Sequence, residues 1–331
     1  MKQSTLPGSD VTVSQLALGC WGLTSDFHWG QRDSAAAQAT VAAALDAGIT
    51  LFDTATMYAD GANETLLGEL LAGKRNEVQI ATKCSPAQTT ADAVAAGLDA
   101  SLTRLKTDYV DLYQIHWAGT DEELAEVWGA LIQLKQLGKA RAVGVCNLGP
   151  KQLDVVSSLE KPSTNQLPYN LLFRAIENEI LPRCKTQKMG VLAYSPLMHG
   201  MLRGEWKTAD EVPATRARSR HFSSQREHVR HDEDGHETLT FDTIECLQQF
   251  ADVSHNTMVE LALRWLASNP QITSILVGAS SPEQIAANAE AIARPLDKEL
   301  LKQVNQVTDP LKQAMGTNAD LWQSAAGSRI H

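Results

Sequence analysis

Eight short apolar segments alternate with helix-forming segments along this chain, and this alternation restricts its fold more than any other feature. Strands that alternate with helices run parallel in one sheet. Eight such units in 331 residues predict an α/β fold, a (β/α)8 TIM barrel that forms a single domain over residues 1–331, rather than an open sheet. The expected strands cover residues 16–18, 49–52, 78–82, 109–115, 142–145, 163–166, 191–194 and 274–277.

Signals for helix ends lie between these strands. Thr120 and Glu123 form a capping box, in which each side chain accepts a hydrogen bond from the backbone N–H of the other residue. Asn63 and Asn256 are expected to cap the N-termini of two further helices. Gly138 follows a helical pattern and is typical of a helix C-terminus. These signals predict helices on the connections between strands, as a (β/α)8 barrel requires.

Two segments depart from the alternation. Residues 199–236, after the seventh strand, are rich in Arg and His, poor in aliphatic residues and without clear periodicity. A connection of this length in a compact domain is usually functional or mobile. Residues 310–331 are predicted to form a polar C-terminal tail that contains a lone tryptophan, Trp322.

Composition argues against several classes of function. A formal charge of −10 disfavours DNA or RNA as a partner, because nucleic-acid binding needs a basic surface. No apolar run is long enough to cross a bilayer, and the N-terminus lacks the apolar stretch of a secretory signal. The five cysteines are widely spaced and include no CxxC pair, which indicates reduced thiols and no zinc site. We therefore expect a cytoplasmic protein without a nucleic-acid, membrane or metal partner.

Polar or aromatic side chains follow every one of the eight expected strands. Active sites of (β/α)8 barrels lie at the C-terminal ends of the strands. Taken singly, each of these residues is more often structural than functional, but their shared position at one rim favours a functional site. The rim residues are Cys20, Trp21, Asp53, Tyr58, Lys83, His116, Trp117, Asn147, Gln166, Tyr194, Ser195, Gly278 and Ser280.

Four of the rim residues form a combination suited to proton transfer. A free phenol such as that of Tyr58 has a pKa of about 10, and a nearby ammonium lowers that pKa by favouring the phenolate. We expect Asp53 to hold the Lys83 ammonium beside Tyr58, and His116 to hydrogen-bond a carbonyl oxygen. This set could give a proton to an oxygen that becomes negative when hydride attacks a carbonyl. Since no side chain donates hydride, a nicotinamide cofactor must be present.

The usual sequence signatures of a nucleotide site are absent, because the chain contains neither GxGxxG nor GxxxxGK[ST]. The cofactor is therefore expected on the barrel rim. Tyr194 could stack on a nicotinamide ring whose carboxamide bonds Asn147 and Gln166. Residues 278–281, at the start of the last predicted helix, could bind phosphate through free backbone N–H groups and the helix dipole.

Several longer segments resemble the aldo-keto reductase family. FDTATMYADGANETLLGELL is similar to the family's first signature, YVDLYQIHW to the segment with its histidine, and GVCNLGP to its carboxamide-binding turn. NQLPYN, AYSPL and LVGASSPEQIAAN are similar to later cofactor segments and occur in the same order. The resemblance covers nearly the whole chain. It implies an NAD(P)H-dependent oxidoreductase that reduces aldehydes or ketones to alcohols, including sugars and small aliphatic or aromatic carbonyl compounds.

The resemblance also implies roles for the rim residues. Asp53, Tyr58, Lys83 and His116 would form a catalytic tetrad in which Tyr58 is the proton donor. Trp21 and Trp117 would form aromatic walls for the substrate. The contacts implied for the cofactor are Gly19, Cys20, Trp21, Asn147, Gln166, Tyr194, Ser195, Leu197, Gly278, Ser280, Gln284 and Asn288.

The sequence departs from the family pattern at two points. The carboxamide turn often reads Ser-Asn, whereas here it is Cys146-Asn147, so one hydroxyl contact is missing. An Arg or Lys commonly grips a 2′-phosphate at the last helix, but GASSPEQ offers only hydroxyl and amide groups. Arg216 or Arg218 of the long connection could supply the cation. We expect NADPH as the cofactor and leave NADH open.

Two other functions remain open from the sequence. Lys83 could form a Schiff base with a carbonyl substrate, as in a barrel aldolase, although Asp53 and Tyr58 suit an ammonium that stays charged. The chain could instead be a regulatory subunit that binds the cofactor with little turnover. Under the reductase reading, the tail resembles the C-terminus of some bacterial family members, and we expect it to pack beside the rim and limit substrate size.

Overall fold

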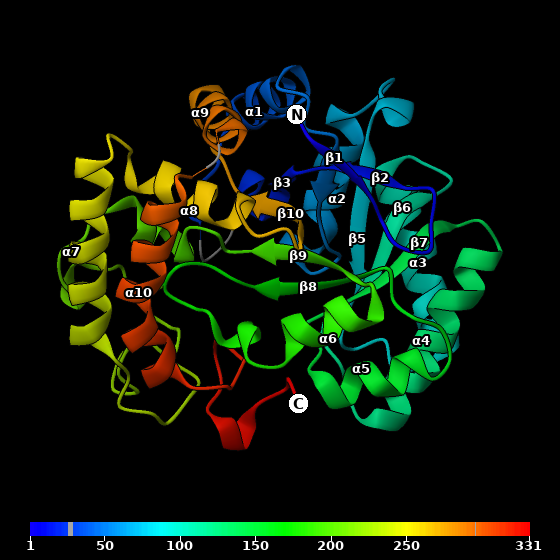
Figure 1. Ribbon diagram of the computed structural model, residues 1–331. Coiled ribbons are helices and arrows are strands. Elements are labelled where there is room, and N and C mark those ends of the chain that lie inside the picture. Colours follow the sequence, from blue (N-terminus) through cyan, green and yellow to red (C-terminus); the bar gives the residue numbers. More distant parts are fainter. Residues whose placement is uncertain (26–28, 295) are drawn as a thin grey trace.

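Eight parallel strands close into a barrel at the centre of the computed structural model, which describes residues 1–25, 29–294 and 296–331 (Figure 1). The last strand pairs with both the first and the seventh strand of the barrel, so the sheet has no free edge. The predicted (β/α)8 fold is confirmed, and each strand overlaps the segment predicted for it. The barrel strands are β3 (Leu16–Gly19), β4 (Leu51–Asp53), β5 (Gln79–Cys84), β6 (Val110–Ile115), β7 (Ala140–Cys146), β8 (Thr164–Pro168), β9 (Gly190–Tyr194) and β10 (Ile272–Val277).

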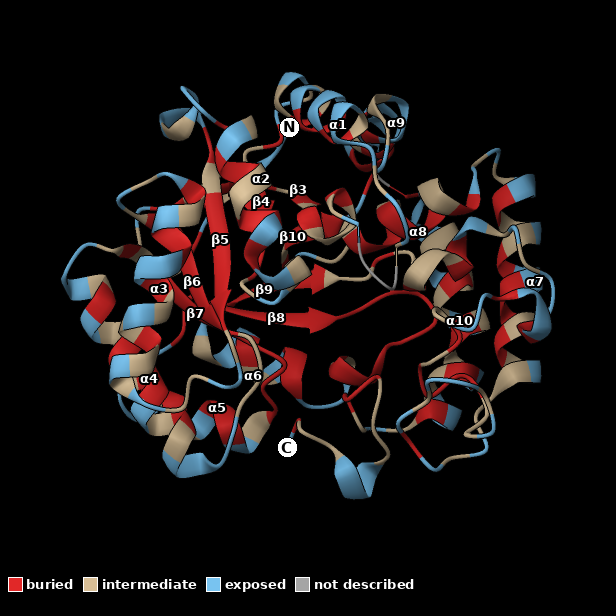
Figure 2. Ribbon diagram, turned by 180° about the vertical axis from the view of Figure 1, so that it is seen from behind, coloured by how far each residue is buried: buried red, intermediate tan, exposed pale blue. Residues whose placement is uncertain are grey.

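Helices surround the barrel and cover it. Figure 2 shows buried strands at the centre and helices whose outer faces are exposed. In the fourth helix, for example, Leu124, Trp128 and Leu131 are buried at helical spacing. The helices are α1 (Ser34–Asp46), α2 (Ala62–Leu70), α3 (Ala91–Leu105), α4 (Asp121–Gln136), α5 (Pro150–Ser157), α6 (Ile180–Gln187), α7 (Glu237–Val253), α8 (Met258–Ala267), α9 (Pro282–Ala293) and α10 (Lys298–Met315).

A short hairpin precedes the barrel. Strands β1 (Gln3–Thr5) and β2 (Thr12–Ser14) pair antiparallel, and Gly8 in the turn between them has a φ of 71°. Leu6, Val11 and Val13 from this hairpin pack in one apolar cluster with residues of the barrel strands. Because β2 leads into the N-terminal end of β3, the hairpin fills that end of the barrel and leaves the opposite end for the site.

Two helix starts differ from the sequence prediction. Asn63 lies inside α2, whose N-cap is Gly61 with a φ of 85°. The N-cap of α8 is Thr257 rather than Asn256, and it forms a capping box with Glu260. In both cases another residue within two positions takes the cap position, since a glycine suits the left-handed backbone and a Thr with Glu three residues later satisfies two N–H groups. The capping box predicted at the start of α4 is confirmed.

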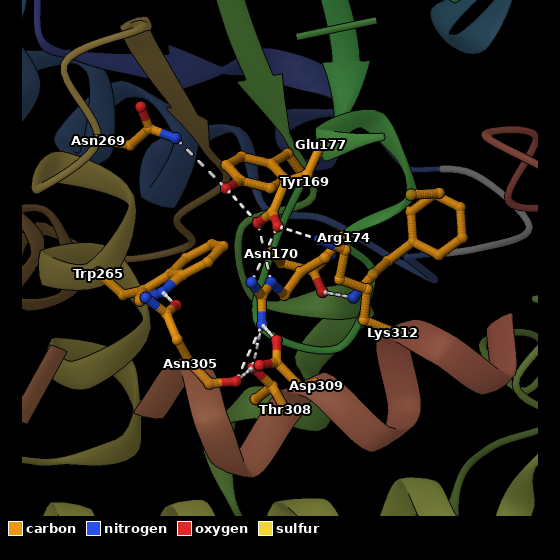
Figure 3. Close-up of polar contacts among 12 residues, drawn as sticks. Tyr169, Asn170, Arg174, Glu177, Trp265, Asn269, Asn305, Thr308, Asp309 and Lys312 are labelled. Atoms are coloured by element: carbon orange, nitrogen blue, oxygen red, sulfur yellow. Dashed lines mark hydrogen bonds and ion pairs between the residues drawn. The ribbon is translucent and has the colours of Figure 1, made fainter. Parts of the chain in front are cut away.

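Helix α10 continues through Pro310, so the predicted start of the tail at that residue is wrong. Proline lacks the N–H that a helix needs at an interior position. Arg174, from the connection after β8, donates to the carbonyl of Asn305 at 3.1 Å and to the hydroxyl of Thr308 at 2.8 Å (Figure 3). These contacts support the turn that contains the proline, and the tail begins at Gly316.

The long connection after β9 and the C-terminal tail pack against one another. As predicted, the connection is mainly irregular, with short 3-10 turns at Met198–Arg203 and Ala209–Glu211. The buried guanidinium of Arg220 donates to the carbonyls of Met315 and Asn318 at 3.1 and 3.0 Å. Connection and tail therefore form one layer at the end of the barrel to which the strands point.

Among the helices of the described residues, none has the length and apolar character needed to cross a membrane. Within the same residues, no group of three or more His, Cys, Asp or Glu side chains could hold a metal ion.

Candidate active site

Asp53, Tyr58, Lys83 and His116 come together at the C-terminal ends of three neighbouring strands, β4, β5 and β6. Lys83 Nζ lies 2.7 Å from Oδ2 of Asp53 and 3.3 Å from the hydroxyl of Tyr58. The rings of Tyr58 and His116 meet edge to face, with centroids 6.0 Å apart. The structure thus places the four predicted residues in one cluster.

The ends of the strands determine where these side chains lie. Asp53 is the last residue of β4, and Lys83 is the penultimate residue of β5, where it is completely buried. Tyr58 opens a short 3-10 turn in which Ala59 and Asp60 have φ values of 49° and 50°. Two consecutive non-glycine residues in this region are unusual and costly. The surrounding packing must therefore hold the loop that presents Tyr58.

Burial determines the protonation of Tyr58. It raises the pKa of the phenol to about 12, although the Lys83 ammonium acts in the opposite direction. The predicted effect of Lys83 is present, but the predicted net lowering is wrong because lost hydration outweighs the charge. Burial also opposes the charge of Lys83, yet attraction to Asp53 raises the pKa of Lys83 above its ordinary value. Tyr58 is protonated and Lys83 is charged at neutral pH.

His116 is a neutral imidazole. Burial, followed by the charge of Lys83, lowers the pKa of His116 to about 3. Its Nδ1 atom is buried without a hydrogen-bond partner among the described residues. A neutral imidazole has one N–H to donate. His116 can therefore hydrogen-bond a carbonyl oxygen without adding a charge to the site.

Gln166 supports the ion pair at the bottom of the site. Its Nε2 atom donates to Oδ1 of Asp53 at 2.8 Å, on the opposite carboxylate oxygen from Lys83. Lys83 also donates to the carbonyl of Thr54 at 2.8 Å. Gln166 was predicted to contact a nicotinamide carboxamide, but in this structure its amide nitrogen donates a hydrogen bond to Asp53. Its carbonyl oxygen is the atom that a carboxamide could reach.

Aromatic side chains form the walls beside Tyr58. Trp21 stacks on Tyr58 with 5.8 Å between centroids and 19° between planes. Trp29, from the same connection after β3, meets Trp21 edge-on at 5.5 Å. Trp117, the other predicted wall, lies beneath Arg329 of the tail, whose guanidinium carbon is 3.6 Å from the ring centroid.

Asn147 and Tyr194 link the predicted nicotinamide site to the tetrad. The Tyr194 hydroxyl donates to Oδ1 of Asn147 at 2.9 Å, and Asn147 Nδ2 donates to the carbonyl of His116 at 3.1 Å. Asn147 has a φ of 59°, a conformation that asparagine adopts more readily than most residues. An aromatic ring and an amide are thus held together next to the catalytic cluster.

The predicted phosphate end lies at the start of α9. Ser281 caps this helix, and Oε1 of Gln284 accepts a hydrogen bond from the backbone N–H of Ser280 at 2.9 Å. The first turn of α9 carries Glu283 and no basic residue. Asn288, on the following turn, is buried. The start of α9 therefore offers hydroxyl and backbone N–H groups to a phosphate.

The ends of β3 and β10 lie side by side and leave open space at Gly278. A Cβ added to Gly278 would meet only the carbonyl oxygen of Gly19, at 3.9 Å, among the described residues. Ser195, at the end of β9, has a φ of 51°, and its hydroxyl lies 3.3 Å from Nε2 of His199. Leu197 follows two residues later and is partly buried. The aromatic, amide, hydroxyl and glycine positions fit a nicotinamide dinucleotide.

The sequence model described as the aldo/keto reductase family matches residues 15–309. The chain belongs to the aldo/keto reductase family. As the resemblance implied, it is an oxidoreductase that reduces carbonyl groups with a nicotinamide cofactor.

Several enzymes are similar to this chain over most of its length. The NADH-specific methylglyoxal reductase of Escherichia coli K12 is 31% identical over 315 residues, which cover 88% of this chain and 94% of that protein. The structure of glycerol dehydrogenase from Gluconobacter oxydans has a TM-score of 0.79 at 29% identity and covers 93% and 95% of the two chains. An aldo/keto reductase from Klebsiella pneumoniae in complex with NADP and acetate has a TM-score of 0.69 at 27% identity, with 90% and 93% covered.

The sequence did not identify Asn63 as part of the reductase site. Its Nδ2 atom donates to the carbonyl of Cys20, and its Oδ1 accepts the hydroxyl of Thr54, both at 2.7 Å. Asn63 therefore joins the segment that carries Trp21 to the residue whose carbonyl receives Lys83. A polar residue at the start of a helical pattern is most simply read as a cap, and only its burial reveals this second role.

Trp29 and Arg329 were also missed as parts of the reductase rim. Both lie in irregular segments, and each meets its partner through the fold rather than through local spacing. The tail as a whole was expected beside the rim, and the contact between Arg329 and Trp117 places it there. No local sequence signal distinguishes these two residues from other exposed aromatic or basic residues.

Proposed function

We propose that this aldo/keto reductase reduces aldehydes and ketones to alcohols with Tyr58 as the proton donor. The main support is the half-buried, protonated phenol that lies 3.3 Å from the Lys83 ammonium and next to a neutral His116 ring. When bound, a nicotinamide cofactor supplies the hydride. The proton and the binding of the carbonyl oxygen come from the chain itself.

Tyr58 and His116 act on the carbonyl oxygen of the substrate. Each can donate one hydrogen bond to this atom. As negative charge develops on the oxygen, the O–H bond of Tyr58 breaks and its proton moves to the oxygen, which becomes the alcohol. Lys83 stabilises the phenolate that remains on Tyr58, because its ammonium is 3.3 Å from the phenol oxygen. Asp53 holds Lys83 in this position at 2.7 Å.

The same ion pair disfavours a Schiff-base lyase. A lysine nucleophile must lose its proton before it attacks a carbonyl, and it usually lies in an apolar pocket or near another cation. Lys83 instead lies beside Asp53, which raises the pKa of Lys83. This charged state supports the electrostatic role of Lys83 in carbonyl reduction.

NADPH is the proposed cofactor, with NADH as the alternative. The Klebsiella pneumoniae structure contains NADP, whereas the Escherichia coli relative is named as NADH-specific. Without a basic residue in the first turn of α9, a 2′-phosphate would depend on hydroxyl groups, on the helix N-terminus and on a cation from the long connection, Arg216 or Arg218. The residues proposed to hold the cofactor are Gly19, Cys20, Trp21, Asn147, Gln166, Tyr194, Ser195, Leu197, Gly278, Ser280, Gln284 and Asn288.

The proposed substrates are small aldehydes and ketones, with Trp21 and Trp117 as aromatic walls. Methylglyoxal, glyceraldehyde and benzaldehyde sample the short aliphatic, sugar-like and aromatic classes. The first of these is the compound named for the Escherichia coli relative. Loss of NADPH or NADH absorbance during turnover measures the reaction directly.

A matched pair of tyrosine variants tests the proton donor. Tyr58→Phe should lower kcat by about a hundredfold or more, as expected for loss of a general acid, with unchanged affinity for NADPH in a fluorescence titration. Tyr113→Phe is the control, because its buried hydroxyl has no hydrogen-bond partner among the described residues. Undiminished turnover by Tyr58→Phe would exclude this donor. Tight NADPH binding by the unmodified protein without turnover of any carbonyl would instead indicate a regulatory subunit.

A further inference from the structure

The loop that presents Tyr58 has a backbone that needs support from its surroundings. Consecutive residues after Tyr58 have positive φ values, 49° at Ala59, 50° at Asp60 and 85° at Gly61. The glycine adopts this conformation readily, whereas it is costly for the alanine and the aspartate. Such a conformation persists only where neighbouring groups determine it. The groups that pack against this loop therefore bear on the position of the proton donor.

Arg104, in the last turn of α3, packs directly against Gly61. A Cβ added to Gly61 would lie 2.7 Å from Nε of Arg104, so the lack of a side chain there lets the guanidinium approach the loop. Helices α2 and α3 are also close at this place, because a Cβ at Gly68 would lie 2.6 Å from the carbonyl oxygen of Arg104. Arg104 is thus fixed between the loop of Tyr58 and the helix that follows it.

Glu64, in the first turn of α2, is the anionic partner of Arg104 and is completely buried. Its Oε2 atom accepts a hydrogen bond from Nε of Arg104 at 2.7 Å, and its Oε1 atom accepts one from the hydroxyl of Thr82 at 2.5 Å. Thr82 precedes Lys83 in β5, and successive side chains of a strand point to opposite faces. Glu64 therefore holds β5 from the helix side, at the residue next to Lys83.

A second series of contacts leads from Arg104 to the backbone of Lys83. Nη2 of Arg104 donates to the hydroxyl of Ser101 at 3.2 Å, and this hydroxyl lies 3.3 Å from that of Thr56. The Thr56 hydroxyl donates to the carbonyl of Lys83 at 3.2 Å. Since Thr56 lies two residues before Tyr58, Arg104 reaches the loop on both sides of the phenol.

We propose that Arg104 and Glu64 are positioning residues that hold the Tyr58 hydroxyl beside the Lys83 ammonium during proton transfer. This inference rests on the proposed function, in which Tyr58 is the proton donor. The carboxylate oxygens of Glu64 bind Thr82 and Arg104, so the pair acts through the loop and the strand rather than on the substrate. A displacement of about 1 Å at a reacting group can lower a rate by about a hundredfold.

Removal of the guanidinium tests this role in the full chain. The substrate is methylglyoxal, glyceraldehyde or benzaldehyde, whichever the unmodified protein reduces fastest. Arg104→Gln should lower kcat about tenfold or more with little change in KM or in NADPH affinity, because the contact that is lost matters in the transition state. Fluorescence titration with NADPH counts the folded molecules, so that kcat refers to these alone. Arg104→Lys keeps the charge beside Glu64 and should recover part of kcat.

The ion pair of Arg75 with Asp111 provides a matched control at the opposite end of the barrel. Its N–O distance is also 2.7 Å, and Asp111 is buried as Glu64 is. Asp111 is the second residue of β6, so it lies away from the rim that carries Tyr58. Arg75→Gln should lower the melting temperature without lowering kcat per folded molecule.

A double-mutant cycle with Tyr58→Phe shows whether the ion pair acts through Tyr58. If it does, Arg104→Gln should have little further effect on the residual kcat of Tyr58→Phe, because the group that Arg104 positions is already absent. Thr82→Val removes one hydrogen bond of Glu64 and keeps the size of the side chain. This variant should give a smaller loss of the same kind, and it takes the place of Arg104→Gln if that protein does not fold.

The possible outcomes are distinct. An unchanged kcat per folded molecule in Arg104→Gln, or in Thr82→Val where Arg104→Gln does not fold, would overturn the inference. An equal loss of kcat with and without the Tyr58 hydroxyl would also overturn it and assign the ion pair to stability alone. Full turnover by Tyr58→Phe would reject the proposed proton donor itself.

Discussion

The guanidinium carbon of Arg329 lies 3.6 Å from the ring centroid of Trp117, so the C-terminal tail covers one predicted wall of the substrate pocket. Asp320, which is completely buried, holds this guanidinium through two hydrogen bonds of 2.8 Å. Gln152 donates to the carbonyl of Arg329 at 2.9 Å and connects it to α5. The tail is thus fixed to the barrel at several points.

Removing the tail should change the range of substrates. Deletion of residues 316–331 uncovers Trp117, and we expect larger aldehydes to gain relative to small ones in kcat/KM. Because the tail starts after α10, circular dichroism should still show a folded barrel. An unchanged ratio between large and small aldehydes in the folded protein would mean that the tail does not limit the pocket.

A single methyl group added at Gly149, which is far from the tail in sequence, should displace the tail. A Cβ at Gly149 would come within 2.6 Å of the backbone of His331, so Gly149→Ala should shift the substrate range in the same direction as the deletion. Gly129→Ala is the control, since the added Cβ meets nothing within 4 Å among the described residues. Kinetics of both variants with the same aldehyde series provide the measurement. Identical profiles for the two variants would contradict this explanation.

Loss of the Asp53 charge should destabilise the fold as well as stop the reaction. Asp53→Asn leaves the ammonium of Lys83 buried without its anionic partner, and we expect a loss of roughly 3–5 kcal/mol in the free energy of unfolding. Asp99→Asn removes a carboxylate that pairs with Lys139 near the surface and should change stability little. Urea unfolding measures the free energy of unfolding of both variants. A similar small loss in both variants would show that the buried pair is not a net requirement for folding.

Acid should destabilise the protein partly through His116. The pKa of His116 is about 3 in the folded state, whereas a free histidine has a pKa of about 6.5. Between these values the unfolded chain binds a proton that the folded site does not, so stability falls by about 1.4 kcal/mol for each pH unit as pH decreases. The contribution of His116 to stability is fully present above a pH of about 6.5, the pKa of the free histidine. His116→Gln should unfold less steeply with acid, whereas exposed His255→Gln should behave as the unmodified protein does. An unchanged slope in His116→Gln would show that His116 becomes protonated in the folded state.

The reaction itself should depend little on pH near neutrality. With pKa values of about 12 for Tyr58 and about 3 for His116, neither residue changes its proton between pH 6 and 9. The value of kcat/KM for a neutral aldehyde should therefore be flat in this range. A decline with an apparent pKa near 7 or 8 would mean that Tyr58 ionises much more easily than the lost hydration of its hydroxyl indicates.

The barrel and the tetrad could be predicted because their signals are local. Apolar segments at regular intervals determine the strands, and parallel pairing brings the end of each strand to one rim. Asp53 and Lys83 lie at the ends of adjacent strands, so their meeting follows from the order of the elements. The net pKa of Tyr58 could not be predicted, since it depends on how deeply the fold buries the ring.

Long-range contacts explain the features that the sequence did not reveal. The polar tail was predicted to begin at Pro310, but α10 continues through this residue, and Arg174 from a distant connection supports that turn. Arg32 and Arg216 are far apart in the chain and meet only because two connections approach each other around Trp29. Such contacts depend on tertiary packing, which local spacing does not encode.

The layer formed by the long connection and the tail has a consequence for binding. Arg220 fastens the two segments together, and the rings of His199 and Trp322 meet across the same boundary at 5.1 Å. One segment carries residues proposed to hold the cofactor, and the other covers Trp117, a proposed wall of the substrate pocket. Displacement of either segment would disturb the other. Binding of the cofactor and binding of the substrate would therefore be coupled rather than independent.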